Sequence, residues 1–194
     1  MKPPDTQNER QWLSQYLDRY RESIFSPDVT APLVELKNLL CSCAQKGGKV
    51  ILAGNGGSSA IASHCAVDLT KQARIRSINF NEVDLVTCFA NDYGYEHWVE
   101  KALEFYGDPD DVVILISSSG KSPNMVNAAR HVLGSGMPLV TFTGFSEDNP
   151  LKKLGQLNFW VNSNAYNIVE MTHHIWLLAV CDLIVGSAEY PSNR

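Results

Sequence analysis

The sequence has few cysteines, and their spacing indicates neither a metal site nor a disulfide framework. The five cysteines are an odd number, and no two of them have the spacing of a CxxC motif. Small domains held by disulfides carry even sets of cysteines, whereas proteins of a reducing compartment keep their thiols free. We therefore expect free thiols, a cytoplasmic location, and packing roles for Cys41 and Cys43.

From the sequence we also expect no signal peptide, and it shows neither a long apolar run nor an excess of positive charge. Residues 1–5 contain two prolines and two charged residues where a signal peptide has an apolar core. No apolar run approaches the roughly 18 residues of a membrane span, so we expect no membrane contact. The net charge of −5 gives no electrostatic reason to bind nucleic acid.

What the sequence does contain is an alternation of strand and helix patterns. Alternating patterns of this kind predict an α/β fold with an open parallel sheet. Strands are expected over 50–54, 77–80, 111–116, 138–144 and 158–161, and the longest helix over 164–185.

Two helical patterns, over 6–24 and 31–43, precede the first strand. We interpret residues 1–47 as a helical pair for oligomerisation and residues 48–194 as the main domain. The apolar faces of the pair favour packing against another subunit, the alternative being that they cover their own sheet.

A glycine-rich turn follows the first strand, in the segment Gly54-Asn55-Gly56-Gly57-Ser58-Ser59. Glycines allow positive φ and close backbone approach, and a serine can cap the helix that begins there. Helix N-termini attract anions through free N–H groups and the helix dipole. We interpret this turn as part of a ligand site, the alternative being an ordinary strand-to-helix turn.

A serine-rich loop, Ser117-Ser118-Ser119-Gly120-Lys121-Ser122, follows the most apolar strand. Hydroxyls and helix N-terminal N–H groups bind a phosphate ester without a metal. The chain has no Walker motif and no GxSxG elbow, and its first turn lacks GxGxxG spacing, so we expect no nucleotide cofactor. Ligands of open parallel sheets bind at the carboxyl ends of strands, where both loops lie.

Together these loops resemble the sugar isomerase (SIS) domain family, and within it the phosphoheptose isomerase group, which acts on sedoheptulose 7-phosphate. The resemblance covers nearly the whole chain. Its motifs are Gly54 to Ser58, His64, Leu69-Thr70, Asn91-Asp92-Tyr93-Gly94, Ile116 to Ser122, Leu139–Gly144, Glu170 and His173.

The resemblance implies a flavodoxin-like three-layer α/β/α sandwich and a homotetramer with active sites at subunit interfaces. It implies that Ser117, Ser119 and Ser122 hold the phosphate of a sugar phosphate. The rest of the substrate would lie against the remaining predicted substrate-binding residues, which are Asn55, Gly56, Gly57, Ser58, Asn91, Asp92 and Ser118.

The chain departs from the family pattern at the catalytic positions. Metal-containing members bind zinc through a His, a Glu one turn later, a Gln early in the last helix and a His two turns further on. These positions fall on His64, Asp68, Glu170 and Leu178. The phosphate loop is kept while the acid–base pair is altered.

An aldose–ketose isomerase needs a base at carbon and an acid or metal at oxygen. We predict Asp68 or Glu170 as the base and His64 as the group that polarises the carbonyl, with His64, Asp68 and Glu170 as candidate Zn²⁺ ligands. His64 and Asp68 share a helix face because they are four residues apart. His64 can instead be a core residue, His173 stays open between the two roles, and His174 is predicted to be structural.

Two functions follow from these residues. The first is a phosphosugar isomerase of the phosphoheptose isomerase type that works through an enediol. The alternative is a non-catalytic phosphosugar-binding protein that acts through a protein partner, as in the replication-initiator-associating members of the family. Leu178 favours the second function, and the carboxylates of Asp68 and Glu170 favour the first.

Overall fold

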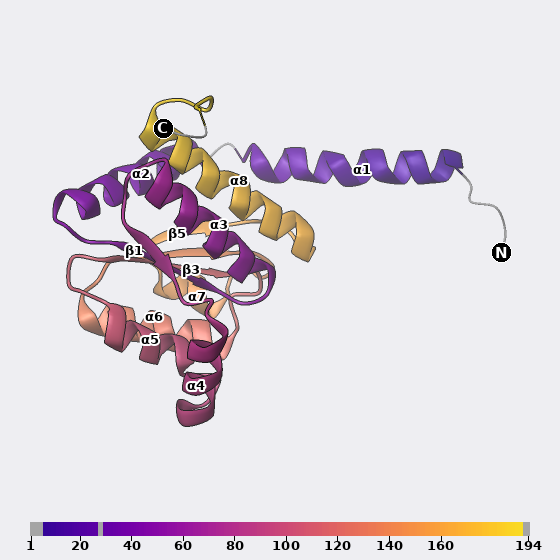
Figure 1. The fold of residues 1–194 in the computed structure, drawn as a ribbon. Helices are drawn as coiled ribbons and strands as arrows, with labels where there is room; N and C mark the ends of the chain where they lie inside the picture. Colours follow the sequence, from indigo (N-terminus) through magenta and orange to yellow (C-terminus); the bar gives the residue numbers. More distant parts are fainter. Residues whose placement is uncertain (1–5, 27–28, 192–194) are drawn as a thin grey trace.

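The computed structural model describes residues 6–26 and 29–191 and contains a five-stranded parallel sheet (Figure 1). The strand order is β2-β1-β3-β4-β5. Their bounds are β1 Val50–Gly54, β2 Ser77–Asn79, β3 Val112–Ser117, β4 Leu139–Thr143 and β5 Leu157–Trp160.

The central strands are buried on both faces, as their continuous apolar runs predict. Every residue of β1, β3 and β4 is buried. Along β3, Val112, Ile114 and Ile116 pack on one side of the sheet while Val113 and Leu115 pack on the other, because successive side chains of a strand point to opposite faces.

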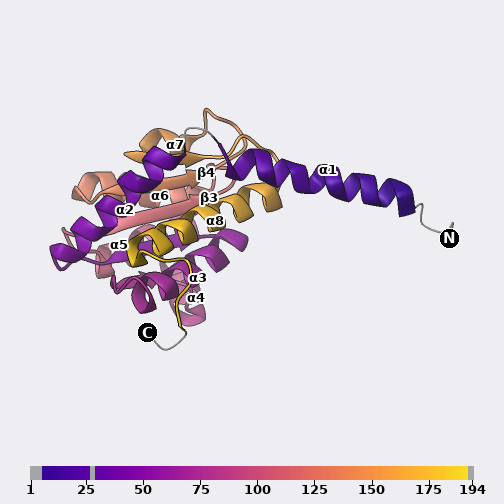
Figure 2. The ribbon, with the colours of Figure 1, turned by 90° about the horizontal axis from the view of Figure 1, so that it is seen from above.

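Helices cover both faces of the sheet and make three layers (Figures 1 and 2). Helices α2 (Thr30–Gln45), α3 (Gly57–Lys71) and α8 (Tyr166–Val185) share one core with the sheet. The other face carries α4 (Val83–Tyr93), α5 (Trp98–Tyr106), α6 (Pro123–Ser135) and α7 (Pro150–Leu154). The predicted flavodoxin-like α/β/α sandwich is confirmed.

The order of the strands places a switch point between β1 and β3. From β1 the chain moves outward to β2 and then returns to β3 on the opposite side of β1. Gly54 at the end of β1 is level with Ile116 near the end of β3. Ligands of open α/β sheets bind in the crevice at such a point.

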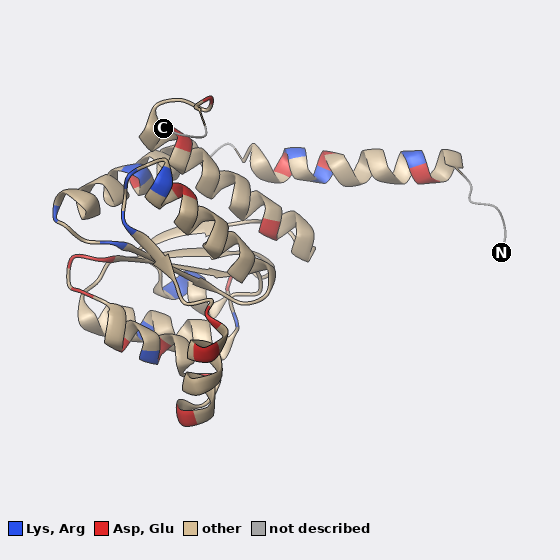
Figure 3. Ribbon diagram, viewed as in Figure 1, with Lys and Arg blue, Asp and Glu red and all other residues tan. Residues whose placement is uncertain are grey.

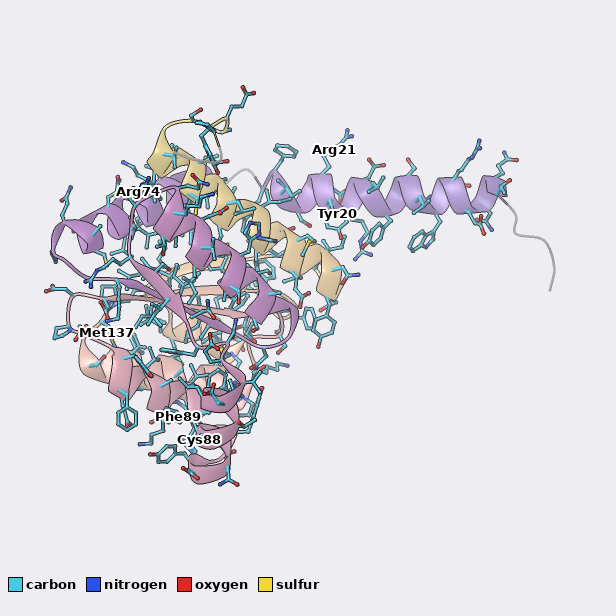
Figure 4. All side chains as sticks on the ribbon, viewed as in Figure 1. Tyr20, Arg21, Arg74, Cys88, Phe89 and Met137 are labelled. Atoms are coloured by element: carbon cyan, nitrogen blue, oxygen red, sulfur yellow. The ribbon has the colours of Figure 1, made fainter. Side chains whose placement is uncertain are left out.

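Helix α1 (Thr6–Ile24) extends away from this body (Figures 1 and 2). It has no buried residue, and Trp12, Leu13 and Leu17 are each more than half exposed. In Figure 4 its side chains, Tyr20 and Arg21 among them, project from a helix that lies beside the body only near its C-terminal end. There the indole of Trp176 donates to the carbonyl of Ile24 at 3.1 Å.

The two N-terminal helices differ in what they cover. Leu36, Leu40 and Cys43 of α2 are buried in the same core as the sheet. The alternative kept open for the pair, that it covers its own sheet, therefore holds for α2. The predicted boundary between residues 47 and 48 does not separate two cores.

Two helices differ from what their local sequence suggests. Asn91-Asp92-Tyr93 form the last turn of α4, whose C-cap Gly94 has φ +88°. Helix α8 is long and apolar enough to cross a membrane by length and composition alone. Its apolar face lies in the core, where Val169, Trp176 and Val180 are buried.

Candidate functional site

A cavity of about 300 Å³ lies at the carboxyl ends of β1 and β3. Both loops singled out in the sequence line it, so the structure brings together Asn55, Gly56, Gly57 and Ser58 with the serine loop. The lining residues are Asn55 to Ser58, Ile116 to Ser119, Ser122, Tyr166 and Glu170. Three helices, α3, α6 and α8, begin at or beside this cavity.

The first loop turns sharply into α3 and carries no side chain where Glu170 approaches it. Gly56 has φ +56°, a backbone conformation that favours glycine. A Cβ atom added to Gly57 would collide with the carboxylate of Glu170. The absence of a side chain at residue 57 thus allows α8 to place a carboxylate against the first residue of α3.

The serine loop presents hydroxyls at the start of α6. The Ser117 hydroxyl donates to that of Ser122 at 3.5 Å, and the Ser119 hydroxyl accepts from the Lys121 N–H at 3.2 Å. The Ser118 hydroxyl is buried and has no hydrogen-bond partner among the described residues. Hydroxyls at the positive end of a helix suit a phosphate group.

Asn149 supports the serine loop from beneath, a role that the sequence did not reveal. Gly120 has φ +63°, and a Cβ atom there would collide with the Asn149 side chain. Asn149 is fully buried, donates to the Thr143 hydroxyl at 3.2 Å and accepts from the Lys152 N–H at 2.8 Å. The dipeptide Asn149-Pro150 is a pattern typical of a helix start, a cap residue followed by proline, from which the capping role could have been predicted.

Glu170 is the carboxylate that lines the cavity. It lies in the second turn of α8, and Tyr166, one turn earlier, lines the same cavity. Burial raises the pKa of Glu170 above its ordinary value. A carboxylate with a raised pKa is a stronger base at neutral pH than an ordinary one.

His64 and Asp68 are not among the residues that line the cavity. They lie on the far part of α3, where His64 Nδ1 is 2.8 Å from His174 Nε2 on α8. His64 Nε2 is 3.5 Å from Asp68 Oδ2. Burial, with His64 beside it, lowers the pKa of His174. The two paired histidines are 110 residues apart in sequence, and the structural role of His174 stays a prediction.

His173, Asn91 and Asp92 also lie outside the lining of the cavity. His173 is fully buried, and its Nε2–H donates to the carbonyl of Thr143 at 3.0 Å. Burial lowers the pKa of His173 to about 4, and its role stays open. Asn91 and Asp92 are exposed at the end of α4, where Asn91 donates to Asp92 at 2.9 Å.

The three predicted zinc ligands do not meet within the chain. Glu170 contacts Gly57, and His64 lies seven residues further along α3, about 10 Å of helix. A different group, Glu100, Glu104 and His131, has its ligand atoms within 4.8 Å of one another. There Lys101 already pairs with the Glu104 carboxylate at 2.8 Å, and none of the three lines the cavity. The zinc site stays a prediction from sequence.

Charge is mixed over the rest of the molecule. Figure 3 shows Lys and Arg interspersed with Asp and Glu along α1 and over the body. At the other end of the strands, Lys49 Nζ lies 2.6 Å from carboxylate oxygens of Asp108 and Asp111. This pairing ties β1 to the start of β3 and is remote from the cavity.

Comparisons with known proteins agree with this geometry. The family model for the SIS domain matches residues 15–144. A phosphoheptose isomerase of Chlorobium limicola is 31% identical over 188 residues, which are 92% of this chain and 87% of that protein. A phosphoheptose isomerase of Cytophaga hutchinsonii is 37% identical over 117 residues, 58% of this chain and 61% of that protein.

The solved structure of a phosphoheptose isomerase from Francisella tularensis has a similar fold. It superposes with a TM-score of 0.84 at 22% identity and covers 95% of this chain and 100% of that chain. At this identity the similarity is one of fold.

Proposed function

The chain belongs to the SIS domain family, and on this premise we propose that it is a phosphosugar isomerase similar to the phosphoheptose isomerases. The reaction moves a proton between adjacent carbons of a sugar phosphate through an enediol. One observation carries the proposal. The cavity at the β1–β3 switch point combines a serine loop at a helix N-terminus with the Glu170 carboxylate.

The serine loop binds the phosphate in this proposal. Ser117, Ser119 and Ser122 supply hydroxyl donors, and the N-terminus of α6 supplies the positive end of a helix dipole. Asn55 and the α3 N-terminus then face the sugar. The relatives named above make sedoheptulose 7-phosphate the first substrate to test.

Glu170 is the base that we favour over Asp68. It lines the cavity, whereas Asp68 does not, and burial raises its pKa. Glu170 removes the proton from the carbon beside the carbonyl, and the electron pair forms the enediol double bond. A proton passes from the neighbouring hydroxyl oxygen to the former carbonyl oxygen, and the same carboxyl group delivers its proton to the former carbonyl carbon. The new carbonyl group then stands on the neighbouring carbon, and the carboxylate is regenerated.

His64 remains our candidate for the group that polarises the carbonyl, with Asp68 and His174 holding its ring. Because His64 and Asp68 lie further along α3, and His174 further along α8, than the residues that line the cavity, their action on a substrate requires a second copy or a movement of α8. The proposed reaction involves no metal-bound step, because the three predicted ligands do not meet within the chain.

We further propose that copies of the chain associate through α1, as in the predicted homotetramer. The support is a 19-residue helix without a buried residue and with large apolar side chains exposed. A cytoplasmic location is supported by the five cysteines, all of which are free.

A conversion assay tests the function. Purified protein is incubated with sedoheptulose 7-phosphate and a panel of ketose phosphates, with and without Zn²⁺, and aldose products are followed by NMR. We expect conversion of at least one sugar. Binding of a sugar phosphate without conversion of any would contradict the isomerase and favour the non-catalytic alternative.

A further inference from the structure

Asn124, which no motif singled out as a site residue, forms a reciprocal amide pair with Asn55. Asn55 Nδ2 donates to Asn124 Oδ1 at 3.0 Å, and Asn124 Nδ2 donates to Asn55 Oδ1 at 2.9 Å. The hydroxyl of Tyr95 donates to the same Asn55 oxygen at 3.2 Å. Asn124 is only 1% exposed, so it meets Asn55 away from solvent.

Hydrogen bonds within the chain occupy most of the donor and acceptor positions of the Asn55 carboxamide. A carboxamide oxygen accepts two hydrogen bonds, and its nitrogen donates two. Asn124 and Tyr95 occupy both acceptor positions of the Asn55 oxygen, and Asn124 occupies one of the two N–H donors. One N–H of Asn55 is left, on a side chain that lines the cavity.

We propose that Asn124 and Tyr95 are positioning residues that fix Asn55 as a single hydrogen-bond donor to an oxygen of the bound phosphosugar. The inference rests on the proposed function and deepens it. Without these partners the amide rotates, and its oxygen and nitrogen exchange places. A sugar oxygen then meets a donor for only part of the time.

The pair also joins the two halves of the site. Asn55 directly follows β1, and Asn124 is the second residue of α6, which begins just after the serine loop. The phosphate contacts do not pass through the amide pair, because the serine hydroxyls come from residues 117–122. Loss of Asn124 therefore weakens binding of the sugar moiety and spares binding of the phosphate.

Calorimetric titration with two probes, inorganic phosphate and sedoheptulose 7-phosphate, separates these effects. For Asn124→Leu we expect about a tenfold loss of affinity for the sugar phosphate, the worth of one ordered hydrogen bond. Its affinity for inorganic phosphate should stay within about twofold. Tyr95→Phe, at an exposed position that does not threaten folding, should give about a threefold loss for the sugar phosphate alone.

Two further variants make the test specific. If Asn124 acts only through Asn55, the double variant Asn55→Ala/Asn124→Leu binds the sugar phosphate no worse than Asn55→Ala. The matched control is Asn127→Ala on the same helix, which removes a hydrogen bond of 2.9 Å to the Glu96 carbonyl and should bind both probes normally.

The outcomes are distinct. Equal losses for both probes in Asn124→Leu, with Tyr95→Phe unchanged, would show that Asn124 is merely structural and would overturn the inference. Normal sugar binding in both variants would also overturn it. A wild-type protein that binds no sugar phosphate of the panel better than inorganic phosphate would refute the proposed function, and this inference with it.

Discussion

At the scale of single residues, the contact between Glu170 and Gly57 fixes the position of the proposed catalytic base. The carboxylate fills the space that a side chain at residue 57 would occupy. Burial in this position is also the cause of the raised pKa of Glu170. One missing Cβ atom therefore controls both the position and the basicity of the proposed catalytic group.

Gly57→Ala should displace Glu170 and lower kcat about a hundredfold, since a misplacement of about 1 Å can cost that much. The measurements are kcat with sedoheptulose 7-phosphate and the melting temperature, which should change little. Gly134→Ala is the control, because a Cβ atom there meets nothing within 4 Å. It should keep full activity and gain about 0.5–1 kcal/mol of stability. Full activity in Gly57→Ala would contradict the placement of Glu170.

His173 should make stability depend on pH. Its pKa is about 4 in the folded chain and about 6.5 when unfolded, so the unfolded chain binds more protons between these values. The contribution of neutral His173 to the free energy of unfolding is therefore complete above the unfolded pKa. It decreases as the pH is lowered, by about 2 kcal/mol between about pH 7.5 and about pH 5. Denaturant unfolding at both values measures it. His173→Gln, which cannot titrate, should remove this part of the slope, and an unchanged slope would refute the assignment.

Local sequence predicts residues that stand in a motif and misses those that meet by packing. The serine loop and Glu170 were found because their positions follow strands or match a spaced pattern. Asn124 and His174 find their partners 69 and 110 residues away. No spacing within one helix indicates such contacts, which depend on how α3, α6 and α8 are placed around the sheet.

At the scale of elements, the start of α6 and the short helix α7 form one unit around the serine loop. Asn149 caps α7 and fills the space beside Gly120, and the Leu151 N–H donates to the Gly120 carbonyl at 3.1 Å. The shape of the serine loop therefore depends on an element that itself contributes no lining residue to the cavity.

Asn149→Ala should lower the free energy of unfolding by about 1–3 kcal/mol, because it removes a helix cap and leaves buried polar groups without partners. It should also weaken binding of inorganic phosphate. Denaturant unfolding and calorimetry measure the two effects. Asp148→Ala, at an exposed neighbour that pairs with Lys153, should stay within about 0.5 kcal/mol of the wild type. Equal stability of both variants would contradict the role of Asn149.

Helix and strand types were predictable where apolar residues recur over a long segment, and less so at element ends. Asn91, Asp92 and Gly94 at the end of α4 are residues typical of turns. The apolar spacing of Val83, Val86 and Phe89 instead carries the helix one turn further, to Tyr93. Cooperative extension of a helix outweighed local turn preference here.

At the scale of the whole molecule, the body is complete without α1. Both cores are built from α2 onward, while α1 leaves Trp12, Leu13 and Leu17 exposed. Exposed apolar surface of this kind marks an interaction site. Sequence could predict two amphipathic helices but not that one covers the sheet and the other projects, because both carry apolar stripes.

The variants Trp12→Glu and Leu17→Glu should therefore reduce the molecular mass in solution without unfolding the chain. Light scattering measures the mass, and circular dichroism checks the fold. Gln11→Glu, on the opposite face of the same helix, is the control and should keep the wild-type mass. A monomeric wild-type protein would refute association through α1.

The central claim is that this SIS-family chain isomerises a phosphosugar with Glu170 as the base, and deuterium exchange tests it most directly. In D₂O, the wild-type protein should exchange the hydrogen beside the carbonyl of sedoheptulose 7-phosphate. Glu170→Gln should bind the sugar phosphate and exchange nothing, while Asp68→Asn should still exchange. Undiminished exchange in Glu170→Gln, or none in Asp68→Asn alone, would contradict the account.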